Sequence, residues 1–243
     1  MQVAIVSVIH GNRHAFEAVL EEVARTDAAE VWCLGDVVGY GADPNDCCAL
    51  AREHADVCLA GNHDLAVTGE LSLEEFSRGA ALAAQWTRDV IASEHLEWLK
   101  SLEPRGRAQT VGLYHASPRD PVWEYVLSAL LAELCLDKAP DRVNLIGHSH
   151  VALSFVRPDG EPATGEPRRG DELLDLTASE WLLNPGSVGQ PRDGDARAAW
   201  LLLDTGHWRA EWRRTEYDIA GAQASIRAAR LPDSLAERLE YGQ

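Results

Sequence analysis

Histidine, aspartate and asparagine side chains recur in this sequence where short apolar runs end. The set comprises His10, Asp36, Asn62, His63, Asp64, His115, His148 and His150. Imidazole and carboxylate groups bind borderline divalent ions well, and the absence of a cysteine cluster disfavours a structural zinc site. These residue types therefore indicate a centre for divalent cations.

The spacing of these residues favours two neighbouring ions rather than one. Asp36 follows Gly35, and its two carboxylate oxygens could face different ions. His148 and His150 are two residues apart, so in an extended segment they share a face and each could serve one ion. Two ions about 3.5–4 Å apart can hold a phosphate group, lower the pKa of bound water and stabilise the transition state of phosphoryl transfer. Alternatively, Asp36 could cap a helix.

The apolar runs before these residues predict strands, and helical patterns separate most of them. We expect strands at residues 2–8, 30–34, 56–59, 108–114 and 142–146. We expect helices after residue 12 and at 45–54, 71–102 and 123–136. Such alternation implies right-handed crossovers and a largely parallel sheet. Ligands bind beyond the carboxyl ends of strands in such sheets, which is where the polar set lies.

The pattern changes after residue 150. Short strands without long helices between them are expected at residues 152–156, 172–176, 181–183, 198–203 and 208–214. They suggest a second, more antiparallel sheet. Residues 157–170 are rich in proline, glycine and charge, as in an exposed loop or hairpin tip. Residues 218–239 return to a helical pattern with Asp218 as N-cap. We expect one domain over residues 1–243, with 218–239 as an extension.

Length and composition are ordinary for a globular protein. The chain has 243 residues, of which 46% are hydrophobic and 25% charged, enough to bury a sizeable core. Its formal net charge of −17 argues against general binding to nucleic acid or to an anionic membrane. A small phosphorylated substrate remains compatible, because a metal centre makes one pocket locally positive.

The cysteines and the apolar runs indicate the cellular compartment. The count of five cysteines is odd and no pair has C-x-x-C spacing, so a disulfide framework is not expected. No run has the length of a membrane span, and the N-terminus lacks the features of a signal peptide. We therefore expect a cytoplasmic protein. The apolar antiparallel half could support a homodimer.

Five motifs together resemble those of the calcineurin-like metallophosphoesterases, in the same order and with reasonable spacing. They are Ser7 to Asn12, Gly35-Asp36, Gly61 to Asp64, His115, and Gly147 to His150. The run from Gly35 to Gly41 and the later Asn184-Pro185-Gly186-Ser187 resemble the small bacterial and archaeal phosphodiesterase branch. The resemblance covers roughly residues 1–205. It implies an α/β fold, a four-layer α-β-β-α sandwich of two mixed sheets flanked by helices.

The resemblance also implies roles for individual residues. One metal ion would be held by His10, Asp36 and His150. The other would be held by Asp36, Asn62, His115 and His148. His63, oriented by Asp64, would lie beside the substrate phosphate with Asn62 and protonate the leaving oxygen, while a metal-activated hydroxide attacks phosphorus. Nitrogen ligands favour Mn, Zn or Fe, with Mg and Ni as further candidates. The substrate would be a phosphodiester or a small phosphomonoester.

The first motif departs from the family pattern. The family has Asp-x-His there, whereas this chain has Val8 in place of the aspartate, and valine cannot bind a metal. One carboxylate instead of two then faces the two dications, so the net charge of the metal centre is about +3 instead of +2. Repulsion between the ions is therefore less compensated. We therefore expect a weakened first site, since three protein ligands can still hold a catalytic metal.

Several alternatives stay open on sequence alone. Retention of His63 and Asp64 favours an enzyme, whereas Val8 favours a catalytically weak module that binds metal and phosphate for regulation. The segment from Asn184 to Ser187 is either a simple turn or a loop that supports the metal cluster. Arg192 follows in a loop rich in glycine and aspartate and could contact a substrate phosphate.

Overall fold

Two mixed sheets of six strands each form the centre of the computed structural model, which describes residues 1–243. One sheet has the strand order β3-β2-β1-β11-β12-β9 and the other β4-β5-β6-β10-β7-β8. Strands β1, β2 and β3 are parallel to one another, as are β5, β6 and β10. The strands are β1 Gln2–Val6, β2 Ala28–Cys33, β3 Val57–Cys58, β4 Arg105–Ala108, β5 Val111–Tyr114, β6 Val143–Leu145, β7 Ala152–Arg157, β8 Thr164–Pro167, β9 Glu172–Asp175, β10 Glu180–Pro185, β11 Ala198–Asp204 and β12 Arg209–Thr215.

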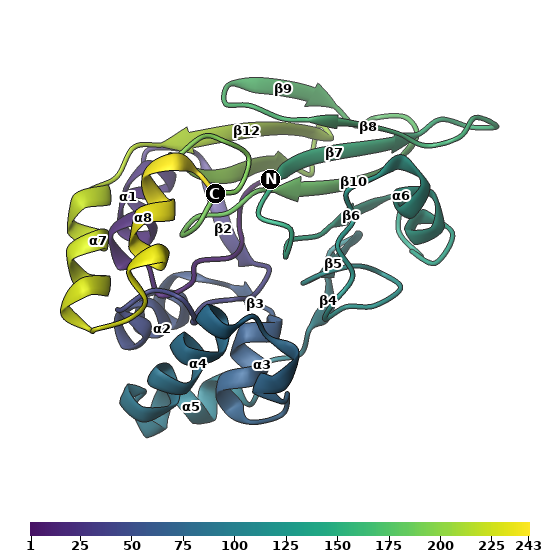
Figure 1. The fold of residues 1–243 in the computed structure, drawn as a ribbon. Helices are drawn as coiled ribbons and strands as arrows, with labels where there is room; N and C mark the ends of the chain where they lie inside the picture. Colours follow the sequence, from purple (N-terminus) through teal and green to yellow (C-terminus); the bar gives the residue numbers. More distant parts are fainter.

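Helices cover the outer faces of both sheets (Figure 1). They are α1 Arg13–Val23, α2 Pro44–His54, α3 Asn62–Thr68, α4 Arg78–Val90, α5 Ser93–Leu99, α6 Ala129–Leu136, α7 Ile219–Ala228 and α8 Asp233–Tyr241, with a short 3₁₀ turn at Leu73–Glu75.

The alternation of side chains along β1 shows how the layers are built. Val3 and Ile5 point into the core between the two sheets, where they meet Leu113 and Leu145 of the second sheet. Ala4 and Val6 point to the other face, toward Phe16 of α1 and its neighbours. Successive residues of a strand point to opposite faces, so an unbroken apolar strand must be covered on both sides.

The second sheet is covered in the same way. Leu182 and Phe155 on its outer face pack against Ala132 and Leu136 of α6 in a separate core cluster. The order of layers is therefore helices, sheet, sheet, helix, and the predicted four-layer α-β-β-α sandwich is confirmed.

The expectation that the strands after residue 150 form a sheet of their own is wrong. Strands β9, β11 and β12 extend the sheet that contains β1, while β7, β8 and β10 extend the sheet that contains β5 and β6. β11 pairs antiparallel with β1, and β10 pairs parallel with β6. The apolar pattern identifies a strand but not its neighbour, because neighbours are chosen by long-range packing.

The predicted long helices are also shorter than expected. The stretch 71–102 is divided into a 3₁₀ turn, α4 and α5, and the helix expected from residue 123 begins only at Ala129, where Ser128 accepts a hydrogen bond from the Leu131 amide. The stretch 218–239 is interrupted near Pro232 and forms α7 and α8. Asp218 caps α7 as predicted, because its side chain accepts from the Gly221 amide at 2.9 Å. Strand β4 begins at Arg105, three residues before the strand predicted at 108–114, and it pairs with β5.

Helices α7 and α8 bring the C-terminal part of the chain close to the N-terminal helix α1. Helix α7 packs against α1 and against α8 (Figure 1). A fourth apolar cluster joins Ile226 of α7 and Leu235 and Leu239 of α8 to Ala80 and Ala83 of α4. The last residues contact the loop after β10, where the Gly194 amide donates to the Gly242 carbonyl at 3.1 Å. No helix is long and apolar enough to cross a membrane.

Candidate metal centre

The polar residues singled out in the sequence lie in loops or at a helix start just after β1, β2, β3, β5 and β6. These strands are parallel within each sheet, so their carboxyl ends meet at one edge. Four members of the set adopt the left-handed backbone region although they are not glycine: His10, Asp36, His148 and His150, with φ between 52° and 61°. Such backbone is costly and concentrates at functional sites.

Three buried histidines have their tautomer fixed by backbone carbonyl groups. The Nδ1–H of His10 donates to Val38 O at 3.0 Å. Nδ1–H of His150 donates to Gln190 O at 2.7 Å, and that of His115 donates to Leu34 O at 2.8 Å. In neutral rings the Nε2 atoms are then acceptors, each with a free lone pair. Ring nitrogens that bind metals are oriented in the same way.

The free nitrogen atoms converge with the Asp36 carboxylate. The Nε2 atoms of His10 and His150 are 3.2 Å apart, close to the separation of about 3.3 Å for two nitrogens around one tetrahedral Zn-like ion. Asp36 Oδ2 is 3.5 Å from His10 Nε2 and 3.6 Å from His115 Nε2. Acceptors that face one another at these distances repel unless a cation lies between them, and therefore the donor set fits divalent ions.

Asp36 is shared by two candidate ligand groups. One group joins it to His10 and His150, and the other to His115 and His148, with the ligand atoms of each group within 4.8 Å of one another. Its Oδ1 accepts from the His63 amide at 2.9 Å, whereas its Oδ2 is buried without a hydrogen-bond partner. Burial raises the pKa of this carboxyl to about 7. A nearby cation would favour the charged form.

The candidate ligand group of Asp36, His115 and His148 has a further oxygen atom nearby. Asn62 Oδ1 lies 3.2 Å from His115 Nε2, which is an acceptor in the tautomer fixed by Leu34. The Nε2 atom of His148 is buried and has no hydrogen-bond partner. Every predicted metal residue thus lies at this one edge, from His10 to His150.

Burial also keeps the imidazoles neutral. It lowers the pKa values of His10, His148 and His150 well below their usual range, and it lowers the pKa of His115 to about 4. Nearby histidines and Arg192 lower these pKa values further in His10, His148 and His150. Only neutral imidazole binds a metal, so ligand binding needs no proton loss near neutral pH.

His63 lies beside this group, but Asp64 does not orient its ring, and that part of the expectation is wrong. The Asp64 carboxylate accepts from the backbone amides of Gly61 at 2.8 Å, Val38 at 3.0 Å and Val37 at 3.2 Å. It therefore fixes the loop after β2 to the start of α3. His63 Nδ1 has no hydrogen-bond partner. Motif spacing does not distinguish a carboxylate that holds a ring from one that holds a loop.

Aromatic packing positions the His63 ring instead. Its centroid is 4.4 Å from that of Tyr40 and 5.0 Å from that of Phe76. Gly39 lies against the ring, since a Cβ there would come within 2.5 Å of Nδ1. Burial and the charge of Arg192 lower the pKa of His63 to about 3, so the ring is neutral before an anion binds.

The segment Asn184 to Ser187 supports the metal loops. Asn184 Nδ2 donates to Gly147 O at 2.7 Å and to the Ser149 hydroxyl at 3.0 Å, so it fixes the Gly-His-Ser-His turn. The Ser187 hydroxyl donates to Val8 O at 2.8 Å. Of the two alternatives left open by the sequence, the supporting loop agrees with these contacts.

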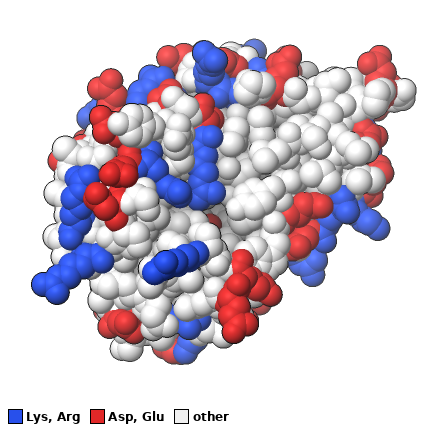
Figure 2. Space-filling model, in the orientation of Figure 1, with Lys and Arg blue, Asp and Glu red and all other residues white.

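A pocket of about 460 Å³ opens beside the histidines. Asn62 and His63 line it together with Phe76, Trp123 and Arg192. Phe76 and Trp123 were not expected in this pocket, because both lie outside any motif and within the helical stretches predicted at 71–102 and 123–136. Figure 2 shows acidic and basic side chains interspersed on one face of the molecule.

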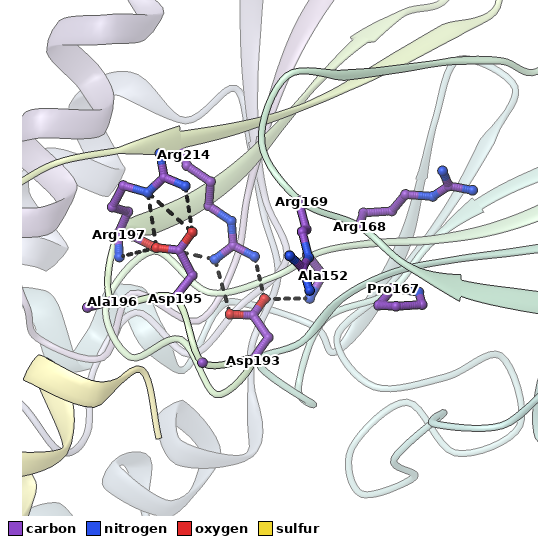
Figure 3. Close-up of a pocket in the computed structure, with 10 residues that line it drawn as sticks. Ala152, Pro167, Arg168, Arg169, Asp193, Asp195, Ala196, Arg197 and Arg214 are labelled. Carbon is purple, nitrogen blue, oxygen red and sulfur yellow. Dashed lines mark hydrogen bonds and ion pairs between the residues drawn. The ribbon is translucent and has the colours of Figure 1, made fainter.

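A buried ion pair, drawn in Figure 3, holds the loop that carries Arg192 in place. Arg214 of β12 and Asp193 have only 3% and 11% of their side-chain surface exposed, and Arg214 Nη1 donates to Asp193 Oδ1 at 3.2 Å. Asp193 also accepts from the Ala152 amide at 3.3 Å. These contacts join the loop to strands of both sheets.

We expect Arg214→Met to lower the free energy of unfolding by about 3–5 kcal/mol, because it leaves the Asp193 carboxylate buried without a counter-charge. Urea denaturation followed by circular dichroism measures the change. The double variant Arg214→Met/Asp193→Leu is the matched control and should recover most of the loss. A single variant as stable as the wild type would show that the pair does not hold the loop.

Comparison with known proteins agrees with this site. Residues 1–207 match the family described as calcineurin-like phosphoesterase superfamily domain. An uncharacterized protein of Methanocaldococcus jannaschii is 38% identical over 251 residues, covering 99% of this chain and 98% of that protein. A crystal structure described as a metallophosphoesterase from Sphaerobacter thermophilus is 38% identical, with a TM-score of 0.90 and full coverage of both chains.

A hypothetical protein of Pyrococcus horikoshii shares the fold at 17% identity, with a TM-score of 0.80 over all of this chain and 98% of that one. The family match over residues 1–207, the two relatives at 38% identity and the cluster of His and Asp ligand atoms point to the same family. The chain therefore belongs to the calcineurin-like phosphoesterase superfamily.

Proposed function

We propose that this protein hydrolyses phosphate esters with two divalent metal ions that share the Asp36 carboxylate. The single observation that supports this most is the buried, unpartnered Oδ2 of Asp36 between two groups of histidines. A structural carboxylate in the same place would have a protein donor on each oxygen. The matching family and the Sphaerobacter thermophilus structure are described as phosphoesterases, which supports the same class of reaction.

The ligand sets follow from the two groups. His10, Asp36 and His150 would hold the first ion, and Asp36, Asn62, His115 and His148 the second. When bound, such ions lower the pKa of a water molecule and neutralise charge on the phosphate oxygens. Nitrogen-rich ligands favour Mn, Zn or Fe over Mg.

Other residues would act on the substrate directly. His63 lines the pocket and would protonate the leaving oxygen, a role for which the charge of a bound phosphate would raise its lowered pKa. Arg192 lines the same pocket, with its guanidinium 5.7 Å from the centre of the Tyr40 ring, and would contact a phosphate oxygen. Phosphodiesters and small phosphomonoesters both suit a pocket of about 460 Å³.

Val8 would weaken the first ion site. Its side chain is fully buried and its backbone has φ of 57°, a conformation that is strongly disfavoured for a β-branched residue. The backbone is held there by hydrogen bonds from Val8 N to Gly35 O at 2.9 Å and from Gly189 N to Val8 O at 3.0 Å. Aspartate or asparagine would occupy this conformation at lower cost.

We expect Val8→Asp to increase affinity for the first Mn²⁺ at least about tenfold, through added negative charge and relief of backbone strain. Isothermal titration of the metal-free protein with Mn²⁺ measures affinity, and hydrolysis of bis(p-nitrophenyl) phosphate at limiting Mn²⁺ measures activity. Val8→Asn is the matched control, because it relieves the same strain without adding charge.

Equal metal affinity in the wild type and Val8→Asp would contradict the proposed weakening. A second candidate function, a regulatory module that binds metal and phosphate without turnover, is favoured by Val8 alone. Binding of Mn²⁺ without hydrolysis by either protein would support that module and reject the enzyme.

A further inference from the structure

The last helix of the chain supplies a second guanidinium to the pocket beside the metal centre. Arg238 of α8 lines this pocket together with Arg192. Helix α8 lies beyond residue 207, where the family match ends. The pocket of this protein is therefore completed by a segment that the family domain does not include.

One buried glutamine holds both arginines. Its side-chain Oε1 accepts from Arg192 Nη2 at 2.9 Å and from Arg238 Nη1 at 3.3 Å, and Gln190 itself is 2% exposed. The backbone carbonyl of Gln190 accepts from His150 Nδ1 at 2.7 Å. The same residue thus connects the two arginines to a candidate metal ligand.

Neither arginine has a carboxylate partner. No ion pair involves Arg192 or Arg238, and the Nε atom of each is buried without a hydrogen-bond partner. Burial and the charge of Arg192 lower the pKa of Arg238. Glu75 also lines the pocket, but it is exposed and bonds to neither arginine.

The arginines of the neighbouring cavity behave differently. There Arg214 is paired with Asp193, and Arg197 donates to Asp195 from Nη2 at 2.6 Å (Figure 3). These two arginines have their own counter-charges, so they do not need an added anion. Two like charges held together without a counter-ion are costly unless an anion joins them.

We propose that Arg192 and Arg238 form an anion subsite for a second anionic group of the substrate, beside the phosphate held at the metal centre. The substrate class is then a phosphate ester with a second phosphoryl group or a carboxylate, rather than a simple monoanionic ester. This rests on the proposed function of the same pocket.

Aromatic residues of the same pocket suit a planar ring. Phe76 and Trp123 line the pocket with their ring centroids 5.2 Å apart, and Trp123 faces His148 at 6.5 Å. Aromatic side chains of this kind stack on planar rings, and they do so with any nucleobase. Adenosine nucleotides with one or two phosphates therefore serve as probes that differ only in the second anionic group.

The test is isothermal titration of the Mn²⁺-loaded protein with AMP and with ADP, at constant free Mn²⁺. We expect Arg238→Gln to weaken ADP binding about 10- to 100-fold, the loss typical of hydrogen bonds to a charged group. AMP binding should weaken less than about threefold. Arg238→Lys, which keeps the charge, should fall between the wild type and Arg238→Gln.

Arg227→Gln is the matched control, since Arg227 lies on α7 in an exposed ion pair with Asp233 at 2.7 Å. It should leave both affinities unchanged. Equal losses for AMP and ADP, or no loss for ADP, in a folded Arg238→Gln protein would overturn the subsite. Hydrolysis of bis(p-nitrophenyl) phosphate by the wild type reports on the proposed function separately, because that substrate carries no second anionic group.

Discussion

Asp36→Asn is expected to reduce kcat/KM for bis(p-nitrophenyl) phosphate about 10³-fold or more, because the one carboxylate shared by both ligand groups becomes neutral. Charge stabilisation by a metal pair contributes several kcal/mol to such reactions, and each 1.36 kcal/mol corresponds to about tenfold in rate. The metal content, measured by inductively coupled plasma mass spectrometry, should fall with the activity.

The substitution is chosen to preserve the fold. Asparagine keeps an oxygen that can accept from the His63 amide, now 2.9 Å from Asp36 Oδ1, and it tolerates the φ of 56° at this position. Asp46→Asn makes the same change of charge at an exposed carboxylate on α2 and should leave activity unchanged. Full metal content and activity in a folded Asp36→Asn protein would rule out the shared-carboxylate centre.

His63→Asn is expected to lower kcat about 10²- to 10⁴-fold for diesters with alkyl leaving groups, the usual range for loss of a general acid. The effect should be much smaller for bis(p-nitrophenyl) phosphate, because p-nitrophenolate leaves without being protonated. Comparison of kcat for the two kinds of substrate measures this difference, which a merely structural role for His63 would not produce.

The ring of His63 packs between Tyr40 and Phe76, so its loss also affects local packing. Metal content of the variant, together with its melting temperature, distinguishes loss of a proton donor from collapse of the pocket. His207→Asn, at a histidine with 78% of its side chain exposed, is the control for removal of an imidazole elsewhere. Equal losses of kcat for both kinds of leaving group would contradict the role of His63 as a proton donor.

Much of the metal centre could be predicted from the sequence, because its ligands lie directly after short apolar strands. The position of Asp36 after β2 and of His115 after β5 follows from the apolar runs alone. Parallel strands bring their carboxyl ends to one edge whatever lies between them in the chain. The four-layer arrangement followed from the family resemblance, since apolar periodicity identifies strands without ordering them.

The orientation of the ligands could not be predicted in the same way. The tautomers of His10, His115 and His150 depend on carbonyl groups of Val38, Leu34 and Gln190, which are distant in sequence. Asp64 illustrates the same limit, because adjacency to His63 suggested a contact with the ring whereas the carboxylate accepts from three backbone amides.

The chain by itself determined which residues could bind a metal and that Val8 could not, because ligand chemistry is a property of residue type. Only the tertiary structure decided which strands became neighbours and which side chains line the pocket. Arg238 lies on α8 and is separated from Arg192 in the sequence by two strands and one helix, and it reaches Gln190 only because α8 packs against the loop after β10. Long-range packing determines these neighbours, and no local pattern in the sequence predicts them.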